Sequence, residues 1–282
     1  MTTLREQFKR DLSIKGFSDK TQSTYLRHVI AFSKFHDKSP DLLGTEEIKD
    51  YLHYIITEKN ISKSYVNQVY SGLKFFYETT LNRDWDMKSI PRTKKIKKLP
   101  LVLSKEEVKR ILESNTNLKH RALLTTIYSA GLRVSEAVNL KIADIDSDNM
   151  LIKVNEGKGG KDRFTILSGV TLDILRDYFK YYKPNEWLFP GADKDKPITT
   201  RTVERVMENS VNKVGMKKHA TVHTLRHSFA THLLENGTDI YYIQKLLGHT
   251  NISTTSIYLH VSNMKIKNIK SPMDTLEDDQ NE

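Results

Sequence analysis

Apolar residues recur with a helical period along most of the chain, and turn-forming residues interrupt this pattern at intervals. In the first third of the sequence, the pattern predicts helices over residues 2–14, 19–37, 45–59 and 62–79. Further along, it predicts helices over residues 105–114, 118–130, 134–140, 170–182, 200–214, 222–235, 239–247 and 253–262. Residues 150–167 alternate with a period of two in two arms around a glycine-rich turn, which predicts a β-hairpin. The expected fold class is mostly α with a small β-hairpin or sheet.

A break in the pattern separates the two groups of helices. Pro91 and Pro100 enclose a stretch with five bases and no acid, and both proline and like charge oppose compact structure. The five bases are Arg92, Lys94, Lys95, Lys97 and Lys98. Ser104 and Glu107 then have the spacing of a capping box, which starts a new helix. We therefore expect a helical domain over residues 1–89, a basic linker over 90–103, a second domain over 104–263, and a C-terminal segment with an acidic tail over 264–282.

Composition favours a soluble protein that acts on a polyanion. The 282 residues include no cysteine, the N-terminus shows no apolar signal region, and no apolar run approaches the length of a membrane span. We therefore expect a cytoplasmic protein without membrane contact. The formal net charge is +10 although the last nine residues hold five acids and no base, so the preceding residues are more basic still. This surplus favours nucleic acid as the partner, and a basic protein without such a partner is the alternative.

The predicted helix over residues 222–235 carries polar side chains among its apolar positions. With successive residues about 100° apart, Leu225, Phe229 and Leu233 lie on one arc of the helix. His223 and Arg226 fall within the same arc, so we expect both side chains to face inward. Because a buried guanidinium without a counter-charge is strongly unfavourable, this arrangement indicates a site for an anion.

Residues elsewhere in the sequence could complete such a site. Arg133 stands at a predicted helix start with Glu136 one turn later, and Lys158 lies in the glycine-rich turn. His249 follows a glycine at a predicted helix end, and Tyr258 lies on the next helix. Taken singly, these residues have ordinary explanations: a surface ion pair, a solvated hairpin lysine, a turn residue and a core aromatic.

Neither a metal ion nor a nucleotide cofactor is indicated by the motifs. His223 and His227 have the i,i+4 spacing of a zinc-binding helix, but Thr224 replaces the glutamate base and no third ligand is evident. The stretch GKGGKD is similar to a phosphate loop, yet Asn155 stands in place of its first glycine and Asp162 in place of its Ser or Thr. We therefore expect no metal site and no cofactor.

Taken together, the motifs carry a resemblance to one family. They are GLRVSE (131–136), GKGGKDR (157–163), HTLRHSFATHLL (223–234) and LLGH (246–249), followed by Tyr258. In this order and spacing they resemble the tyrosine recombinases, also called phage integrases, and above all the small two-domain Xer-type members. The resemblance covers essentially the whole chain. It implies an N-terminal helical, SAM-like domain that binds DNA and a C-terminal mixed α/β catalytic domain.

The resemblance also implies a set of catalytic residues. They are Arg133, Lys158, His223, Arg226, His249 and the nucleophile Tyr258, with Glu136 in a supporting role. In such a site the tyrosine attacks a DNA phosphodiester to form a 3′-phosphotyrosine, and the arginines bind the non-bridging oxygens. His223 is expected to accept the tyrosine proton and His249 to donate a hydrogen bond to the phosphate. Lys158 is expected to protonate the leaving 5′ oxygen, with Lys161 as its competitor.

The implied activity is site-specific recombination of double-stranded DNA through a Holliday junction. The implied enzyme is a homotetramer on synapsed sites, associated with the nucleoid, and needs neither metal nor ATP. Two other interpretations stay open: a DNA-binding protein that does not cut, and a topoisomerase-like enzyme that relaxes supercoils as a monomer.

Expected contacts with DNA and with other protomers lie outside the catalytic set. The phosphate-binding side chains are expected to be Lys20, Arg27, Lys63 and Lys74, together with the linker bases Arg92, Lys94, Lys95, Lys97 and Lys98. Residues 261–272 follow the nucleophile and are amphipathic, so we expect them to dock on a neighbouring protomer. A local helix that packs on its own domain is the alternative.

Overall fold

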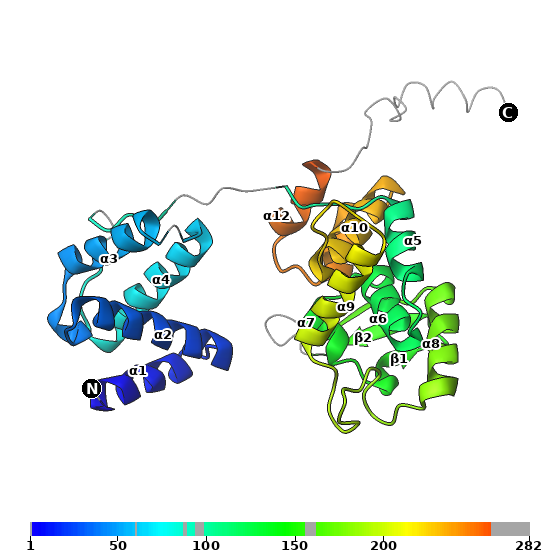
Figure 1. Cartoon of the computed structure of the whole chain (residues 1–282), viewed down its shortest axis with the longest axis horizontal. Helices are drawn as coiled ribbons and strands as arrows, with labels where there is room; N and C mark the ends of the chain where they lie inside the picture. Colours follow the sequence, from blue (N-terminus) through cyan, green and yellow to red (C-terminus); the bar gives the residue numbers. More distant parts are fainter. Residues whose placement is uncertain (1, 60, 87–88, 94–98, 156–161, 261–282) are drawn as a thin grey trace, which may run out of the picture. The chain divides into compact units, whose positions relative to one another are not determined.

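The computed structural model describes residues 2–59, 61–86, 89–93, 99–155 and 162–260 (Figure 1). The chain divides into two compact units, Met1–Lys97 and Lys98–Glu282. The division falls inside the predicted basic linker. Within the described residues, no helix has the length and apolar character needed to span a membrane.

The N-terminal unit is a small bundle of helices. Its helices are α1 (Thr2–Ile14), α2 (Asp19–His36), α3 (Thr45–Thr57) and α4 (Lys63–Phe75), with a short 3-10 turn η1 (Pro40–Leu42) and a π turn η2 (Phe76–Thr80) that continues α4. The side chains of Ser18 and Ser62 cap the first turns of α2 and α4. Helices α2 and α4 pack together over a core that includes Phe32 and Leu73, both fully buried.

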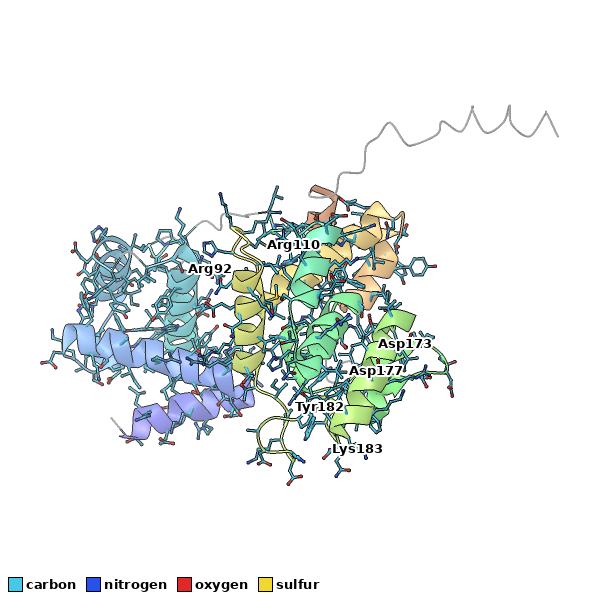
Figure 2. All side chains as sticks on the ribbon, turned by 45° about the vertical axis from the view of Figure 1, so that its right-hand side comes forward. Arg92, Arg110, Asp173, Asp177, Tyr182 and Lys183 are labelled. Atoms are coloured by element: carbon cyan, nitrogen blue, oxygen red, sulfur yellow. The ribbon has the colours of Figure 1, made fainter. Side chains whose placement is uncertain are left out.

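The residues at each end of the predicted linker pack on the unit next to them in the sequence. Ile90 is buried in the N-terminal core, and Arg92 donates from Nη2 to Ser71 Oγ of α4 at 2.8 Å (Figure 2). Leu103 is buried in the C-terminal unit, where its backbone N–H donates to Ser228 Oγ at 3.0 Å. The chain is therefore anchored on each side of residues 94–98.

The C-terminal unit is built around the buried helix α6. Its helices are α5 (Lys105–Glu113), α6 (Leu118–Ser129), α7 (Val134–Val138), α8 (Gly169–Tyr182), α9 (Thr200–Lys213), α10 (Val222–Glu235), α11 (Ile240–Leu247) and α12 (Ile252–Thr255), with 3-10 turns η3 (Ile142–Asp144) and η4 (Ser256–His260). Helix α6 packs against both α8 and α10, and Leu123, Leu124 and Ile127 are completely buried in it. Figure 2 shows Asp173 and Asp177 along α8.

A small antiparallel sheet accompanies these helices. Its strands are β1 (Ile145–Asp146), β2 (Leu151–Val154) and β3 (Arg163–Ile166), in the order β1-β2-β3. Strands β2 and β3 are the arms of the predicted hairpin, with Val154 opposite Arg163. The two-residue strand β1 was not predicted, because it is too short to show an alternating pattern. The fold class, mostly α with a small sheet, is confirmed.

The last predicted helix, over residues 253–262, differs from the structure. The α-helix α12 ends at Thr255, and the chain continues as the 3-10 turn η4 to His260. In a 3-10 turn, residues three apart lie one above the other, so Thr255 and Tyr258 both point into the core. Thr255 is completely buried and Tyr258 is 2% exposed.

Candidate active site

The site begins just after the end of α6, at Gly131, where any side chain would be strained. Gly131 has φ of 60°, and a Cβ added to it would overlap the ring of Phe229. The turn makes Arg133 the N-cap of α7 and puts Glu136 at its third position. The Glu136 carboxylate accepts the backbone N–H of Arg133 at 2.7 Å and its Nη1 at 2.6 Å. The predicted pair of Arg133 and Glu136 is therefore present, and a tight turn fixes it.

In the part of the chain that the structure describes, Glu136 is the one carboxylate that these ion pairs place among three guanidinium groups. Besides Arg133, it accepts two hydrogen bonds of 2.8 Å from Arg163, and its Oε2 lies 3.6 Å from Nη1 of Arg226. Burial alone would raise the pKa of Glu136, but the hydrogen bonds and charge of Arg163, together with hydrogen bonds from Arg133, lower it to about 2. The carboxylate is therefore ionised, and the cluster still carries excess positive charge.

Arg226 lies in the middle of this cluster, on α10, with 4% of the residue exposed. Its Nη1 donates to the carbonyl oxygen of Gly131 at 2.5 Å, and its Nη2 donates to that of Leu247 at 2.6 Å. Burial lowers the pKa of Arg226 to about 9, with a further contribution from Arg133. The prediction that Arg226 faces inward is confirmed.

The same prediction for His223 is wrong, because the structure leaves this residue exposed. His223 lies in the first turn of α10, where it borders a cavity of about 570 Å³ that Val134 and Met216 also line. Helical periodicity gave the direction of the side chain around the axis. It did not show that this end of the helix opens onto a hollow.

His249 follows Gly248, which ends α11 in the left-handed conformation with φ of 62°. Its Nε2 lies 3.2 Å from Nη2 of Arg226, and its Nδ1 lies 2.9 Å from Oγ1 of Thr255. Burial, reinforced by the charge of Arg226, lowers the pKa of His249 to about 4, so the imidazole is neutral. Since a guanidinium only donates, Nε2 accepts from Arg226 and Nδ1–H donates to Thr255.

The hydroxyl of Tyr258 lies 3.0 Å from Nδ1 of His227, the residue after Arg226 on α10. Burial is the main cause that lowers the pKa of His227 to about 4, and the charges of His223 and Arg226 lower it as well. Burial also raises the pKa of Tyr258, against the opposing effect of Arg226 and Arg133. A neutral imidazole therefore accepts a hydrogen bond from a neutral phenol, and the hydroxyl lies beside the arginine cluster.

Comparison with known proteins now decides the family. The family model "Phage integrase family" matches residues 102–265, and "Phage integrase, N-terminal SAM-like domain" matches residues 4–87. The chain belongs to the phage integrase family. It is similar to an integrase/recombinase of Sinorhizobium fredii, with 44% identity over 277 residues that cover 98% of this chain and 90% of the relative. It is also similar to the tyrosine recombinase XerC of Staphylococcus aureus, with 32% identity over 287 residues that cover 95% of each chain.

Solved structures agree with this assignment. The crystal structure of XerA recombinase is 31% identical, has a TM-score of 0.55, and is matched over 93% of this chain and 94% of that chain. A lambda integrase dimer bound to a core site shares the fold, with a TM-score of 0.76 at 20% identity over 96% of this chain and 99% of that chain. The protein is therefore a tyrosine recombinase, an enzyme of site-specific recombination, and its N-terminal unit is the SAM-like domain of this phage integrase.

Two residues of this integrase site were missed by the motif analysis. Arg163 ends the motif GKGGKDR and was given no role, although it holds both carboxylate oxygens of Glu136. The sequence motifs mark His227 only as a possible zinc ligand, although it contacts Tyr258. Its position directly after Arg226 and one turn after His223 was the available signal. Within the part of the chain that the structure describes, no group of three or more potential ligands could hold a metal.

The remaining predicted site residues have less contact information. Lys158 and Lys161 lie outside the described residues, as do Lys94, Lys95, Lys97 and Lys98 of the linker. On α2 and α4, Lys20, Arg27 and Lys63 are exposed, and Lys74 pairs with Glu78 at 3.4 Å. Their contact with DNA stays a prediction.

Proposed function

We propose that this tyrosine recombinase cuts double-stranded DNA at specific recombination sites with the hydroxyl of Tyr258. The observation that carries the proposal is the position of that hydroxyl. It is bonded to His227, and the adjacent Arg226 holds both His249 and the turn before Arg133. Attack on phosphorus forms a 3′-phosphotyrosine and releases a 5′ hydroxyl. Reversal by another 5′ hydroxyl rejoins the strand, so the bond energy is conserved and ATP is not needed.

Arg133 and Arg226 are proposed to bind the non-bridging oxygens of the scissile phosphate. With Arg163 they surround a single carboxylate, and a phosphodiester supplies the negative charge that the cluster lacks. Guanidinium groups suit this task because their planar donors match two oxygens at once. As phosphorus becomes five-coordinate, charge grows on these oxygens, and donors fixed in advance stabilise the transition state.

Proton transfer is proposed to involve residues on both sides of the phosphate. His223 lies one turn before His227 on α10, and we assign it the proton of Tyr258 during attack. Lys158 is proposed to protonate the 5′ oxygen, because an alkoxide is a far stronger base than a lysine amine with a pKa of about 10.4. His249 is proposed to donate to a non-bridging oxygen once phosphate charge favours its protonated form.

The assembly is proposed to be a homotetramer that exchanges strands between two sites through a Holliday junction. A lambda integrase tetramer bound to a Holliday junction has the same fold as this chain, with a TM-score of 0.76. The amphipathic residues 261–272 are proposed to dock on a neighbouring protomer; they lie outside the described residues. We place the enzyme in the cytoplasm, associated with the nucleoid.

A nicked suicide substrate tests the nucleophile. The duplex carries the recombination site, found by footprinting, and the nick lets a short strand leave after cleavage so that religation is prevented. The wild-type protein should form a covalent adduct, and Tyr258→Phe should bind the DNA equally well without forming one. An adduct with Tyr258→Phe excludes this nucleophile. Binding without any wild-type adduct supports a DNA-binding protein that does not cut, and a single protomer in sedimentation supports a relaxing enzyme.

A further inference from the structure

Arg163 is a half-buried arginine to which the proposed reaction gives no direct role. It begins β3, opposite Val154 of β2, and only 10% of its side chain is exposed. Its Nη1 and Nη2 donate to the two carboxylate oxygens of Glu136, each at 2.8 Å. A bidentate pair of this kind fixes the position and the plane of both groups.

The third nitrogen of Arg163 reaches a different element. Its Nε donates to the carbonyl oxygen of Leu246 at 2.8 Å, in the last turn of α11. Gly248 closes that helix, and a Cβ added to it would lie 2.8 Å from Cδ of Arg163. Arg226 holds the next carbonyl along the chain at 2.6 Å. Two arginines therefore fix successive carbonyls just before His249.

We propose that Arg163 is a positioning residue of the recombination reaction, which holds Glu136 in place for Arg133 and holds the turn that carries His249. It acts through these residues and not on the phosphate, because each of its three nitrogens donates one N–H to a protein oxygen and only 10% of its side chain is exposed. The inference rests on the proposed function, in which Arg133 and His249 contact the scissile phosphate.

The electrostatic consequence concerns Glu136. The charged groups that face it are Arg133 from its own helix, Arg163 from β3 and Arg226 from α10, and His249 is the nearby titratable group at the end of α11. Burial favours the protonated acid, and the hydrogen bonds of Arg163 are the first of the effects that keep the pKa of Glu136 near 2. Removal of Arg163 must therefore raise that pKa, so the carboxylate would take up a proton at a higher pH.

Cleavage rates measured at saturating DNA test the proposal. Arg163→Met should slow adduct formation on the nicked substrate by about 10- to 100-fold, because small displacements of the phosphate-binding groups have effects of this size. Arg163→Lys keeps the charge but has one donor group in place of the planar fork, so it should be slow as well. DNA affinity should stay within about threefold of wild type, since Arg163 is not proposed to touch DNA. The matched control is Arg176→Met, because the side chain of Arg176 on α8 is 59% exposed and its Nη1 lies 3.7 Å from Asp173.

Two further readouts separate positioning from general stability. The rate of Arg163→Met, expressed relative to wild type at each pH, should fall further as the pH is lowered, because Glu136 takes up a proton at a higher pH than in the wild-type protein. Glu136→Gln has no carboxylate to protonate. In that background, Arg163→Met should lower the rate by less than it does in the wild-type protein, because only the bond to Leu246 is still lost, and the additional loss at low pH should be absent.

The outcomes distinguish this inference from the proposed function. An adduct with the wild-type protein and none with Tyr258→Phe establishes the reaction without reference to Arg163. If Arg163→Met then unfolds in a thermal melt, Arg163→Lys carries the test. Rates within about threefold of wild type for Arg163→Lys, or a relative rate that does not change with pH, overturn the positioning role.

Discussion

The two ends of the active site start from adjacent residues of α10 but are held by different forces. At the phosphate end, Arg226 joins a cluster of charges around Glu136. At the nucleophile end, His227 holds Tyr258 through one hydrogen bond between neutral groups. At the phosphate end, hydrogen bonds and ion pairs already hold the charged groups in place in the absence of DNA. In the proposed reaction, the hydroxyl of Tyr258, a residue that is 2% exposed, exchanges its bond to His227 for contact with phosphorus.

Among the substitutions at the two ends, Arg226→Lys should have the largest effect on the rate of cleavage. A lysine ammonium cannot bond to the carbonyls of Gly131 and Leu247 while also presenting two planar donors to a phosphate. We expect adduct formation to slow by about 10²- to 10³-fold, the usual cost of losing one preorganised donor. The measurement is single-turnover cleavage of the nicked substrate, with Arg176→Lys on α8 as the exposed control. A rate within about tenfold of wild type would show that charge alone suffices at this end.

Substitution of His223 and His227 of α10 should separate loss of the proposed proton acceptor from loss of the contact that positions Tyr258. His223→Gln should slow cleavage by about 10²-fold, as expected for loss of a proton acceptor, and should leave the free protein unchanged. His227→Gln should slow cleavage by only about 10-fold, because the hydroxyl leaves His227 during attack.

In the protein without DNA, we expect His227→Gln to have the larger effect of the two substitutions, measured on the pKa of Tyr258. NMR of ring-labelled tyrosine, with Tyr258→Phe to assign the signal, should show a changed Tyr258 pKa in His227→Gln and not in His223→Gln. This follows because His227, and not His223, contacts the hydroxyl. A larger loss of cleavage in His227→Gln than in His223→Gln would transfer the proton-accepting role to His227.

The sequence predicted the two ends of the site unequally for physical reasons. Helical periodicity predicted correctly that Arg226 of the phosphate end faces inward, and a buried guanidinium requires oxygens around it. The same periodicity was misleading for His223, because an angle around the helix axis does not say whether another element covers that position. Arg163 was missed because its role depends on Glu136, which is far away in sequence and is brought close only by the sheet.

The fold shows the same division between local and long-range information. The spacing of apolar residues and the capping box of Ser104 and Glu107 predicted helices close to those of the structure, because these signals act within one turn. The 3-10 turn that carries Tyr258 was not foreseen, since it depends on Thr255 packing beneath His249. Local pattern therefore predicts elements, and contacts between distant residues decide how their ends are arranged.

Acid should weaken the two ends in different pH ranges. His227 and His249 have pKa values of about 4 when folded and an ordinary value of 6.5 when unfolded. Above pH 6.5 both histidines are neutral in the folded and in the unfolded protein, so they do not lower the free energy of unfolding. As the pH falls from 6.5 to 4, the unfolded chain takes up the protons first, and the free energy of unfolding decreases. The loss is at most about 3.5 kcal/mol for each histidine, since one pKa unit corresponds to about 1.4 kcal/mol and the folded and unfolded values lie 2.5 apart. Glu136, with a folded pKa of about 2, contributes stability that is lost only below its ordinary value of 4.5.

Urea unfolding at stepped pH tests this separation. His227→Gln and His249→Gln should flatten the upper part of the stability curve, and Glu136→Gln should flatten the part below pH 4.5. His28 in the N-terminal unit has the same lowered pKa of about 4, so His28→Gln serves as the control that leaves the active site intact. If the histidine variants lose stability with acid as steeply as wild type, the two sites are not neutral in the folded protein.

The smallest expected effect concerns the link between the two ends, which runs through His249. Its Nε2 meets Arg226 of the phosphate end, and its Nδ1–H meets Thr255, on the turn that carries Tyr258. Thr255→Val keeps the shape of a completely buried side chain and removes only this acceptor. The loss of one hydrogen bond is worth about 1 kcal/mol, so cleavage should slow by about 3- to 10-fold. Nitrogen NMR of His249 should then show a changed tautomer balance, and the exposed neighbour Thr254→Val should show neither effect. Equal rates for Thr255→Val and Thr254→Val would mean that Arg226 alone orients His249, and that the two ends of the site are set independently.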